Sequence, residues 1–196
     1  MNPFYLMNQL MNTSLNPEYI ITQLLRLVNS DKRSEIRLNA NGGNSVLVVC
    51  PPSLEYQFIE KIYSMMPTGT FQVIDINEIL ISFVEEHQVD IDEMFDLLKG
   101  SVHQIFKAPE GETSPDLFKL LISAIEKSYK EDKIPVLIHS GALYGSGIDN
   151  IHLMEHELVM NSKIPLIILY PATQEGDKLM FLHSRHASKY RGMIVN

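Results

Sequence analysis

Four short apolar runs constrain the fold of this chain more than any other feature of its sequence. Each is apolar nearly throughout and rich in Val, Ile and Leu, which is the pattern of a strand buried on both of its faces. Strands of this kind occur in parallel sheets that are covered by helices on both sides. The four runs are SVLVVC (45–50), FQVIDI (71–76), PVLIHS (135–140) and PLIILYP (165–171).

Helical patterns separate these runs. The first helix is predicted to begin at Asn16-Pro17-Glu18, a capping residue followed by Pro, and to bury an apolar stripe. A second helix is expected after Pro51-Pro52-Ser53, and a third from Asn77 as its cap. Further helices are expected over 91–106, over 115–129 from a start at Ser114-Pro115-Asp116, and over 148–161.

The resulting order of strands and helices predicts an α/β fold with three layers. We expect a mainly parallel sheet of about four central strands, with helices on both faces. LMFLH (179–183) and GMIV (192–195) are expected as C-terminal edge strands. A chain of 196 residues fits one domain, so we expect a single domain over 1–196, with residues 1–38 as a helical segment packed on it.

Composition excludes several classes of function. Sixteen basic and twenty-four acidic residues give a net charge of −8, which argues against broad binding of a nucleic-acid backbone. The single cysteine, Cys50, permits no internal disulfide and no Cys-based metal cage. The sequence shows no signal-peptide pattern and no apolar run near the roughly 20 residues of a membrane span. We therefore expect a cytoplasmic protein with no membrane partner.

In a parallel α/β sheet, ligands gather at the carboxyl ends of the strands. A small-molecule site is therefore expected there, with His139, Ser140 and Asp149 near its mouth. The segments that follow the four strands are Pro51–Glu55, Asp75–Glu78, His139–Gly147 and Tyr170–Gly176.

The segment HLMEH (152–156) matches the H-x-x-E-H signature of inverted zinc peptidases. On one helix, His152 and His156 would share a face, but catalytic zinc needs a third protein ligand. Glu175 is the only later Glu, and it is expected in a turn. We interpret HLMEH as part of a helix packed on the sheet. A looser metal site involving the histidines of the last third, 139, 152, 156, 183 and 186, is the alternative to surface and edge-strand histidines.

The loop HSGALYGSGIDN (139–150) leaves a buried strand and enters a helix, as phosphate-binding loops do. Its glycines, Gly141, Gly145 and Gly147, match neither G-x-G-x-x-G nor the Walker pattern, and the loop has no lysine. Ser146 lacks the first glycine of G-x-S-x-G. The sequence of this loop is therefore typical of a tight turn. No catalytic residue, cofactor or metal ligand is assigned from the sequence.

The acidic stretch VDIDEMFDLL (89–98) and the pair Glu85-Glu86 are typical of a solvated helix face. The alternative is an acidic surface that binds a partner.

Three stretches taken in order resemble a known family. They are VVCPPSLEYQFIEKI, FQVIDINEILISFVEE and IPLIILYPATQEGDKLMFLHSRHASKYRGMIV. Together they resemble the BrxB family, small accessory proteins of BREX phage-defence systems, over residues 45–196. The matching positions are Pro52, Glu55, Asp75, Ile76, Gly141, Tyr170, Pro171, Gly176, Leu179, Phe181, Tyr190 and Arg191.

This chain departs from the family pattern at two places. Ala172 replaces the glycine after Tyr-Pro, and GSGIDNIH replaces an aromatic-Pro-Phe-Leu-Arg stretch.

The resemblance implies a non-catalytic interaction component of an anti-phage defence system that binds another subunit, of the PglZ type. A homo-oligomer is left open. The pair Tyr190-Arg191 has residue types favoured at interface hot spots, although Arg191 paired with a surface carboxylate is the alternative. The second hypothesis is a small-ligand- or metal-dependent enzyme that uses the strand-end cleft near Gly141–Gly147. Candidate interaction or cleft residues are Pro52, Glu55, Asp75, Ser140, Gly141, Tyr170, Pro171, Gly176, Tyr190 and Arg191.

Overall fold

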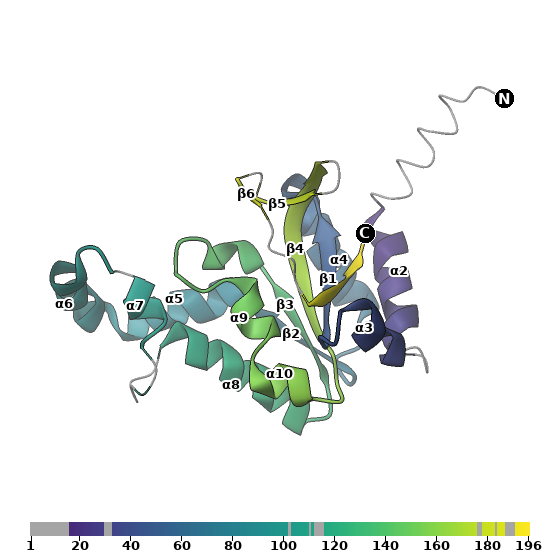
Figure 1. Cartoon of the computed structure of the whole chain (residues 1–196), viewed down its shortest axis with the longest axis horizontal. Coiled ribbons are helices and arrows are strands. Elements are labelled where there is room, and N and C mark those ends of the chain that lie inside the picture. Colours follow the sequence, from purple (N-terminus) through teal and green to yellow (C-terminus); the bar gives the residue numbers. More distant parts are fainter. Residues whose placement is uncertain are drawn as a thin grey trace.

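The four apolar runs form neighbouring strands of one sheet in the computed structural model (Figure 1). The structure describes residues 16–29, 33–101, 103–109, 111, 116–175, 178–182, 184–186 and 191–196. The strand order is β2-β3-β4-β1-β7, and each neighbouring pair is parallel. The predicted α/β fold with a mainly parallel sheet is therefore confirmed. The strands are β1 (Ser45–Cys50), β2 (Phe71–Asp75), β3 (Ile134–Ile138), β4 (Leu166–Glu175) and β7 (Gly192–Val195).

Alternate residues of the central strands enter two separate cores. In β1, Val46, Val48 and Cys50 pack into one core, while Leu47 and Val49 pack into the other. This alternation follows from the period of two along a strand. It explains why β1 and β3 are apolar at nearly every position, since both of their faces are buried.

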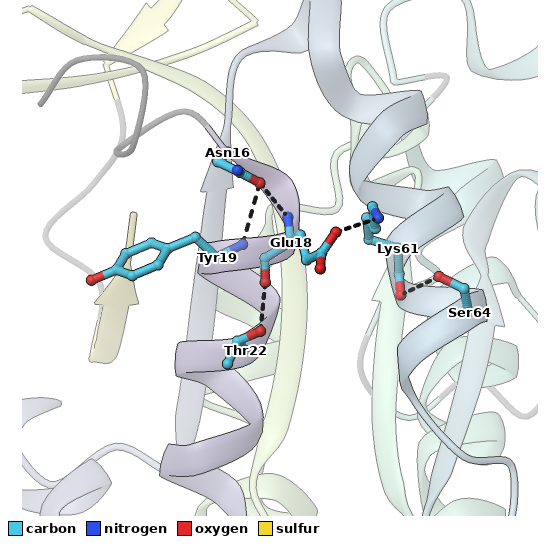
Figure 2. Close-up of polar contacts among 6 residues, drawn as sticks. All are labelled: Asn16, Glu18, Tyr19, Thr22, Lys61 and Ser64. Atoms are coloured by element: carbon cyan, nitrogen blue, oxygen red, sulfur yellow. Dashed lines mark hydrogen bonds and ion pairs between the residues drawn. The ribbon is translucent and has the colours of Figure 1, made fainter. Parts of the chain in front are cut away.

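One face of the sheet is covered by α2 (Pro17–Val28), α3 (Arg33–Asn39) and α4 (Glu55–Met65). α2 begins where the sequence predicts, because the Asn16 side chain accepts hydrogen bonds from the backbone N–H groups of Glu18 and Tyr19. Figure 2 shows these bonds, and also Glu18 Oε2 2.7 Å from Lys61 Nζ of α4. The ammonium group of Lys61 lowers the pKa of Glu18 through a hydrogen bond and its charge.

The opposite face carries the remaining helices. Two 3-10 turns, η1 (Pro52–Leu54) and η2 (Ser140–Leu143), follow β1 and β3. The helices are α5 (Ile76–Glu86), α6 (Gln88–Leu98), α7 (His103–Phe106), α8 (Leu117–Lys130), α9 (Asn150–Met154) and α10 (Glu157–Asn161).

The C-terminal segments extend the sheet in two ways. β5 (Lys178–Phe181) pairs antiparallel with the long end of β4, and β6 (Arg185–His186) pairs with β5. β7 returns to lie beside β1, parallel to it. Both predicted late strands are therefore present. β7 lies at the edge beside β1, as predicted, whereas β5 lies between β4 and β6 and ends at Phe181, and His183 of the predicted segment lies outside the described residues.

Several predicted boundaries are wrong. β2 ends at Asp75 and not at residue 76, and Asp75 caps α5 in place of Asn77, because its side chain accepts the N–H groups of Asn77 and Glu78. β3 ends at Ile138, before the predicted 140, whereas β4 continues four residues beyond its predicted end, to Glu175.

The predicted helices also differ in their bounds. The helix predicted over 91–106 is two helices, α6 and α7. α8 is capped by Asp116, whose side chain accepts the N–H of Lys119, while 114 and 115 lie outside the described residues. Within the described part of the chain, no helix is long and apolar enough to cross a membrane.

Candidate functional site

Three titratable side chains converge at the carboxyl ends of the strands. Glu55 begins α4 after β1, Asp75 ends β2, and His139 directly follows β3. His139 Nδ1 lies 2.9 Å from Asp75 Oδ1. With the proton on Nδ1, the ring donates to the carboxylate and its Nε2 keeps a lone pair. The strand ends thus bring these three titratable side chains together, and the small-molecule site expected there stays a prediction.

His139 has a backbone conformation that is uncommon for a residue with a side chain. Its φ of 54° and ψ of 40° lie in the left-handed region. This residue turns the chain from β3 into η2, while its half-buried ring remains paired with Asp75.

Glu55 is the unsatisfied member of the group. Its Oε1 is buried, and no hydrogen-bond partner for it exists in the described part of the chain. Burial raises the pKa of Glu55, the charge of His139 opposes this rise, and the charge of Asp75 adds to it. The site therefore couples a carboxyl group that resists ionisation to a neighbouring imidazole–carboxylate pair.

Cys50, at the end of β1, adds no nucleophile to this site. Burial, and then the nearby charge of Glu55, raise the pKa of its thiol well above the usual range. A buried thiol of high pKa is unreactive, since the thiolate is the nucleophile. Cys50 is a core residue, fully buried among apolar side chains.

The other candidates at this edge have packing roles. Ser140 is buried, and its Oγ donates to the carbonyl of Leu169 at 2.7 Å, which ties η2 to β4. Tyr170 is fully buried and stacks on Phe181 of β5, with ring centroids 4.8 Å apart. A Cβ added at Gly141 would be in van der Waals contact with the side chains of Leu182 and Pro171. Pro52 opens the 3-10 turn η1 before Glu55.

Arg191 lies at the opposite end of the strands from Glu55, Asp75 and His139. The next residue, Gly192, pairs with Ser45, which is the first residue of β1 and so marks its amino end. Arg191 Nε lies 3.7 Å from Oε1 of Glu155, and both side chains are about half exposed. The surface ion pair that the sequence left as an alternative is therefore present. Tyr190 and Gly176 lie outside the described residues, and the described candidates do not form one site.

HLMEH does not lie on one helix, so the predicted helix over 148–161 is wrong. α9 ends at Met154, and α10 begins at Glu157. Nδ1 of His152 accepts the N–H of Asp149 at 2.9 Å, and Nδ1 of His156 accepts the N–H of Leu158 at 3.2 Å.

Each histidine of HLMEH thus supports the start of its own helix. Burial, and then the charge of Lys107, lower the pKa of His152, which favours the neutral ring that this bond requires. No group of three or more potential metal ligands occurs among the residues that the structure describes.

A second candidate surface lies on α6, which the sequence pattern marks only by its acids. Of its eleven residues, only Ile91 is buried. Val89 is 72% exposed, Phe95 50% and Leu97 80%. A helix that buries one residue would ordinarily be polar over the rest of its surface. The sequence predicts a solvated acidic face here, and the structure adds large apolar side chains that are exposed on the same helix.

The arrangement of the chain thus offers two places where function can reside. The first is the strand-end group of Glu55, Asp75 and His139, and the second is α6 with its exposed apolar side chains. They lie on different elements and imply different kinds of chemistry. Comparison with protein-family models, with curated proteins and with solved structures finds no match to this chain.

Proposed function

We propose that this chain is a non-catalytic, protein-binding component of a bacterial anti-phage defence assembly. The observation that carries the proposal is α6, an acidic helix with large apolar side chains exposed along it. The resemblance of residues 45–196 to the BrxB family supplies the kind of assembly and the kind of partner, a PglZ-type subunit.

The position of α6 suits it to binding. It lies at one end of the long axis of the molecule, away from β1 and β7 (Figure 1). A large side chain that moves from water into an apolar interface gains about 1.5–3 kcal/mol. Exposed apolar patches on soluble proteins commonly mark interaction sites. Val89 and Leu97 lie about 80° apart around the helix, so a partner that covers them would gain this burial.

Capture of a tagged full-length chain, co-expressed with the products of its flanking genes, tests the proposal. We expect a PglZ-type product to be retained over several salt concentrations. Leu97→Ser should weaken retention, because it removes an exposed leucine from α6. Leu38→Ser on α3 is the matched control, since Leu38 is 79% exposed and lies on the other face of the sheet. If no defence-system partner is retained at any salt concentration, the proposal is wrong.

A second candidate function is a small-ligand-binding or metal-dependent enzyme that uses the strand-end edge. The specific observation that favours it is the group of Glu55, Asp75 and His139, with a buried carboxyl oxygen that lacks a hydrogen-bond partner in the described part of the chain. Groups with shifted pKa values cluster at functional sites, although structural pairs shift pKa values too.

Metal analysis of the purified protein and a thermal-shift screen with nucleotides separate this candidate from the first. A bound metal, or a nucleotide-dependent shift that His139→Asn abolishes, would support it. Sub-stoichiometric metal together with no shift from any nucleotide would remove it.

A further inference from the structure

We propose that the groove between α5, α6 and α7 binds a basic amphipathic helix of a partner protein. The inference rests on the proposed protein-binding function and specifies where binding occurs and what the partner carries.

The floor of the groove is apolar and comes from three elements. Phe83 of α5, Ile91 of α6 and Ile105 of α7 are buried at its base. Met94 and Leu97 of α6 form an exposed apolar wall. The cavity has a volume of about 410 Å³. Such a space accepts several aliphatic or aromatic side chains, which are the anchors that a helix presents when it lies in a groove.

The rim of the groove is acidic. Asp90 and Glu93 of α6 line it and are exposed. α5 and α6 together carry seven carboxylates, and no lysine or arginine occurs between Lys61 and Lys99. Near the groove, Lys119 Nζ lies 3.5 Å from Oδ2 of Asp116, and His87 Nδ1 lies 3.8 Å from Oδ2 of Asp90. The carboxylates of α5 and α6 outnumber these groups, so the potential over the rim is negative. A partner segment with lysine or arginine beside its apolar anchors complements both the floor and the rim.

One end of the groove is lined by a carboxylate that already accepts hydrogen bonds from the backbone. Asp116 is buried, and its two oxygens accept the N–H groups of Ala108 and Lys119. The charge that faces a ligand therefore comes mainly from the exposed acids of α6.

The length of α6 defines the length of the partner segment. Eleven residues at about 1.5 Å each give a wall of about 16 Å, or three helical turns. A partner helix of that length presents apolar residues at positions i, i+3 or i+4, and i+7.

The charge also argues against other occupants. A second copy of this chain would bring the same acidic helices face to face, and like charges at an interface disfavour association. Nucleic acid and anionic lipid surfaces would be repelled for the same reason.

Fluorescence anisotropy with two synthetic peptides tests the inference on the purified full-length chain. The probe is an amphipathic peptide of about four turns, ~14 residues, with leucines on one face and lysines on the other. The control peptide has glutamate in place of every lysine. We expect the lysine peptide to bind at least about tenfold more tightly, with affinity falling as salt rises.

Two charge-reversal variants locate the binding. Asp90→Lys with Glu93→Lys changes the rim, whereas Asp92→Lys with Asp96→Lys makes the same charge change on α6 away from the groove-lining residues. We expect a loss of about tenfold or more for the first variant and at most about threefold for the second. Circular dichroism confirms that both variants fold.

Three outcomes would overturn the inference. Equal losses of peptide affinity in the two variants would show that the peptide binds to net charge alone. Equal affinity for the two peptides would show that the acidic rim does not distinguish a basic from an acidic peptide. Dimerisation of the wild-type chain that Leu97→Glu abolishes would assign the groove to a second copy. The peptide measurement uses the chain alone, so its failure beside successful capture of a flanking gene product would reject the groove and retain the proposed function.

Discussion

Asp75 combines two roles that the sequence does not separate. Its Oδ1 caps α5 through the N–H groups of Asn77 and Glu78, and the same oxygen meets Nδ1 of His139. The convergence of strand ends is predictable, because parallel strands end at a common edge. The pairing itself is not, since it depends on the left-handed backbone of His139, and such a conformation is rare in residues with side chains.

Glu55→Gln tests the electrostatics of this group. Because burial raises the pKa of Glu55, the folded state binds its proton more tightly than the unfolded state does. The stability of the wild type therefore falls as pH rises from about 4.5 through the higher pKa of the folded state. Glutamine removes this dependence, so the variant should match the wild type at acid pH and equal or exceed its stability at neutral pH.

Thermal melting across pH measures this difference. Glu60→Gln, an exposed carboxylate on the same helix, is the control. A slope with pH that is the same in Glu55→Gln as in the wild type would contradict the account.

Gly43→Ala tests a close backbone approach. A Cβ at this position would lie 1.8 Å from the carbonyl oxygen of Arg191. The clash forces β7 away from β1, so we expect a loss of about 2 kcal/mol or more in urea denaturation. Gly69→Ala is the control, because a Cβ at residue 69 would have nothing within 4 Å of it. Equal stability of the two variants would show that the segment before β7 shifts freely.

At the scale of elements, the sequence predicts which strands and helices are present better than it predicts the residues at which each begins and ends. β1 and β3 are found because they are buried on both faces and nearly all apolar, which few other structures allow. The helix predicted over 148–161 is broken, because His156 supplies a side-chain cap within it. Capping is expected from Ser, Thr, Asp and Asn, so a histidine in that role gives no sequence signal.

His156→Ala should cost about 1 kcal/mol of stability, as the loss of a helix cap usually does. His156→Asn keeps a side-chain acceptor for the N–H of Leu158 and should retain most of that stability. Urea denaturation of both variants measures the difference. If asparagine destabilises the protein as much as alanine, the histidine acts through its contact with the Phe118 ring and not as a cap.

At the scale of the whole molecule, the order of the strands brings together residues that are distant in the chain. β7, the last strand, lies beside β1, so Arg191 falls at the amino end of the sheet while Glu55, Asp75 and His139 gather at the carboxyl end. The order of the candidate site residues along the sequence cannot show that they lie at opposite ends of the sheet. It follows only from which strands pair.

The same scale explains why the sequence does not reveal the groove. The acids of α6 predict a solvated helix face, or an acidic surface that binds a partner, and they do not show which apolar side chains stay exposed. α6 and α7 instead lie beyond the sheet at one end of the molecule (Figure 1). Val89, Phe95 and Leu97 of α6 are exposed. Helices with few buried contacts open more readily than central strands.

Hydrogen exchange of the isolated chain should therefore show faster exchange in α6 than in β1 or β4. Equal protection of all three elements would mean that α6 is held by contacts other than Ile91.

Hydrogen exchange compared between the isolated chain and the captured assembly tests the central claim most directly. If this protein binds its partner through α6, protection should increase over residues 76–106 and remain unchanged at Glu55, Asp75 and His139. Protection that increases only at Glu55, Asp75 and His139, with α6 unchanged, would contradict the account. It would place the binding surface at the carboxyl ends of the strands.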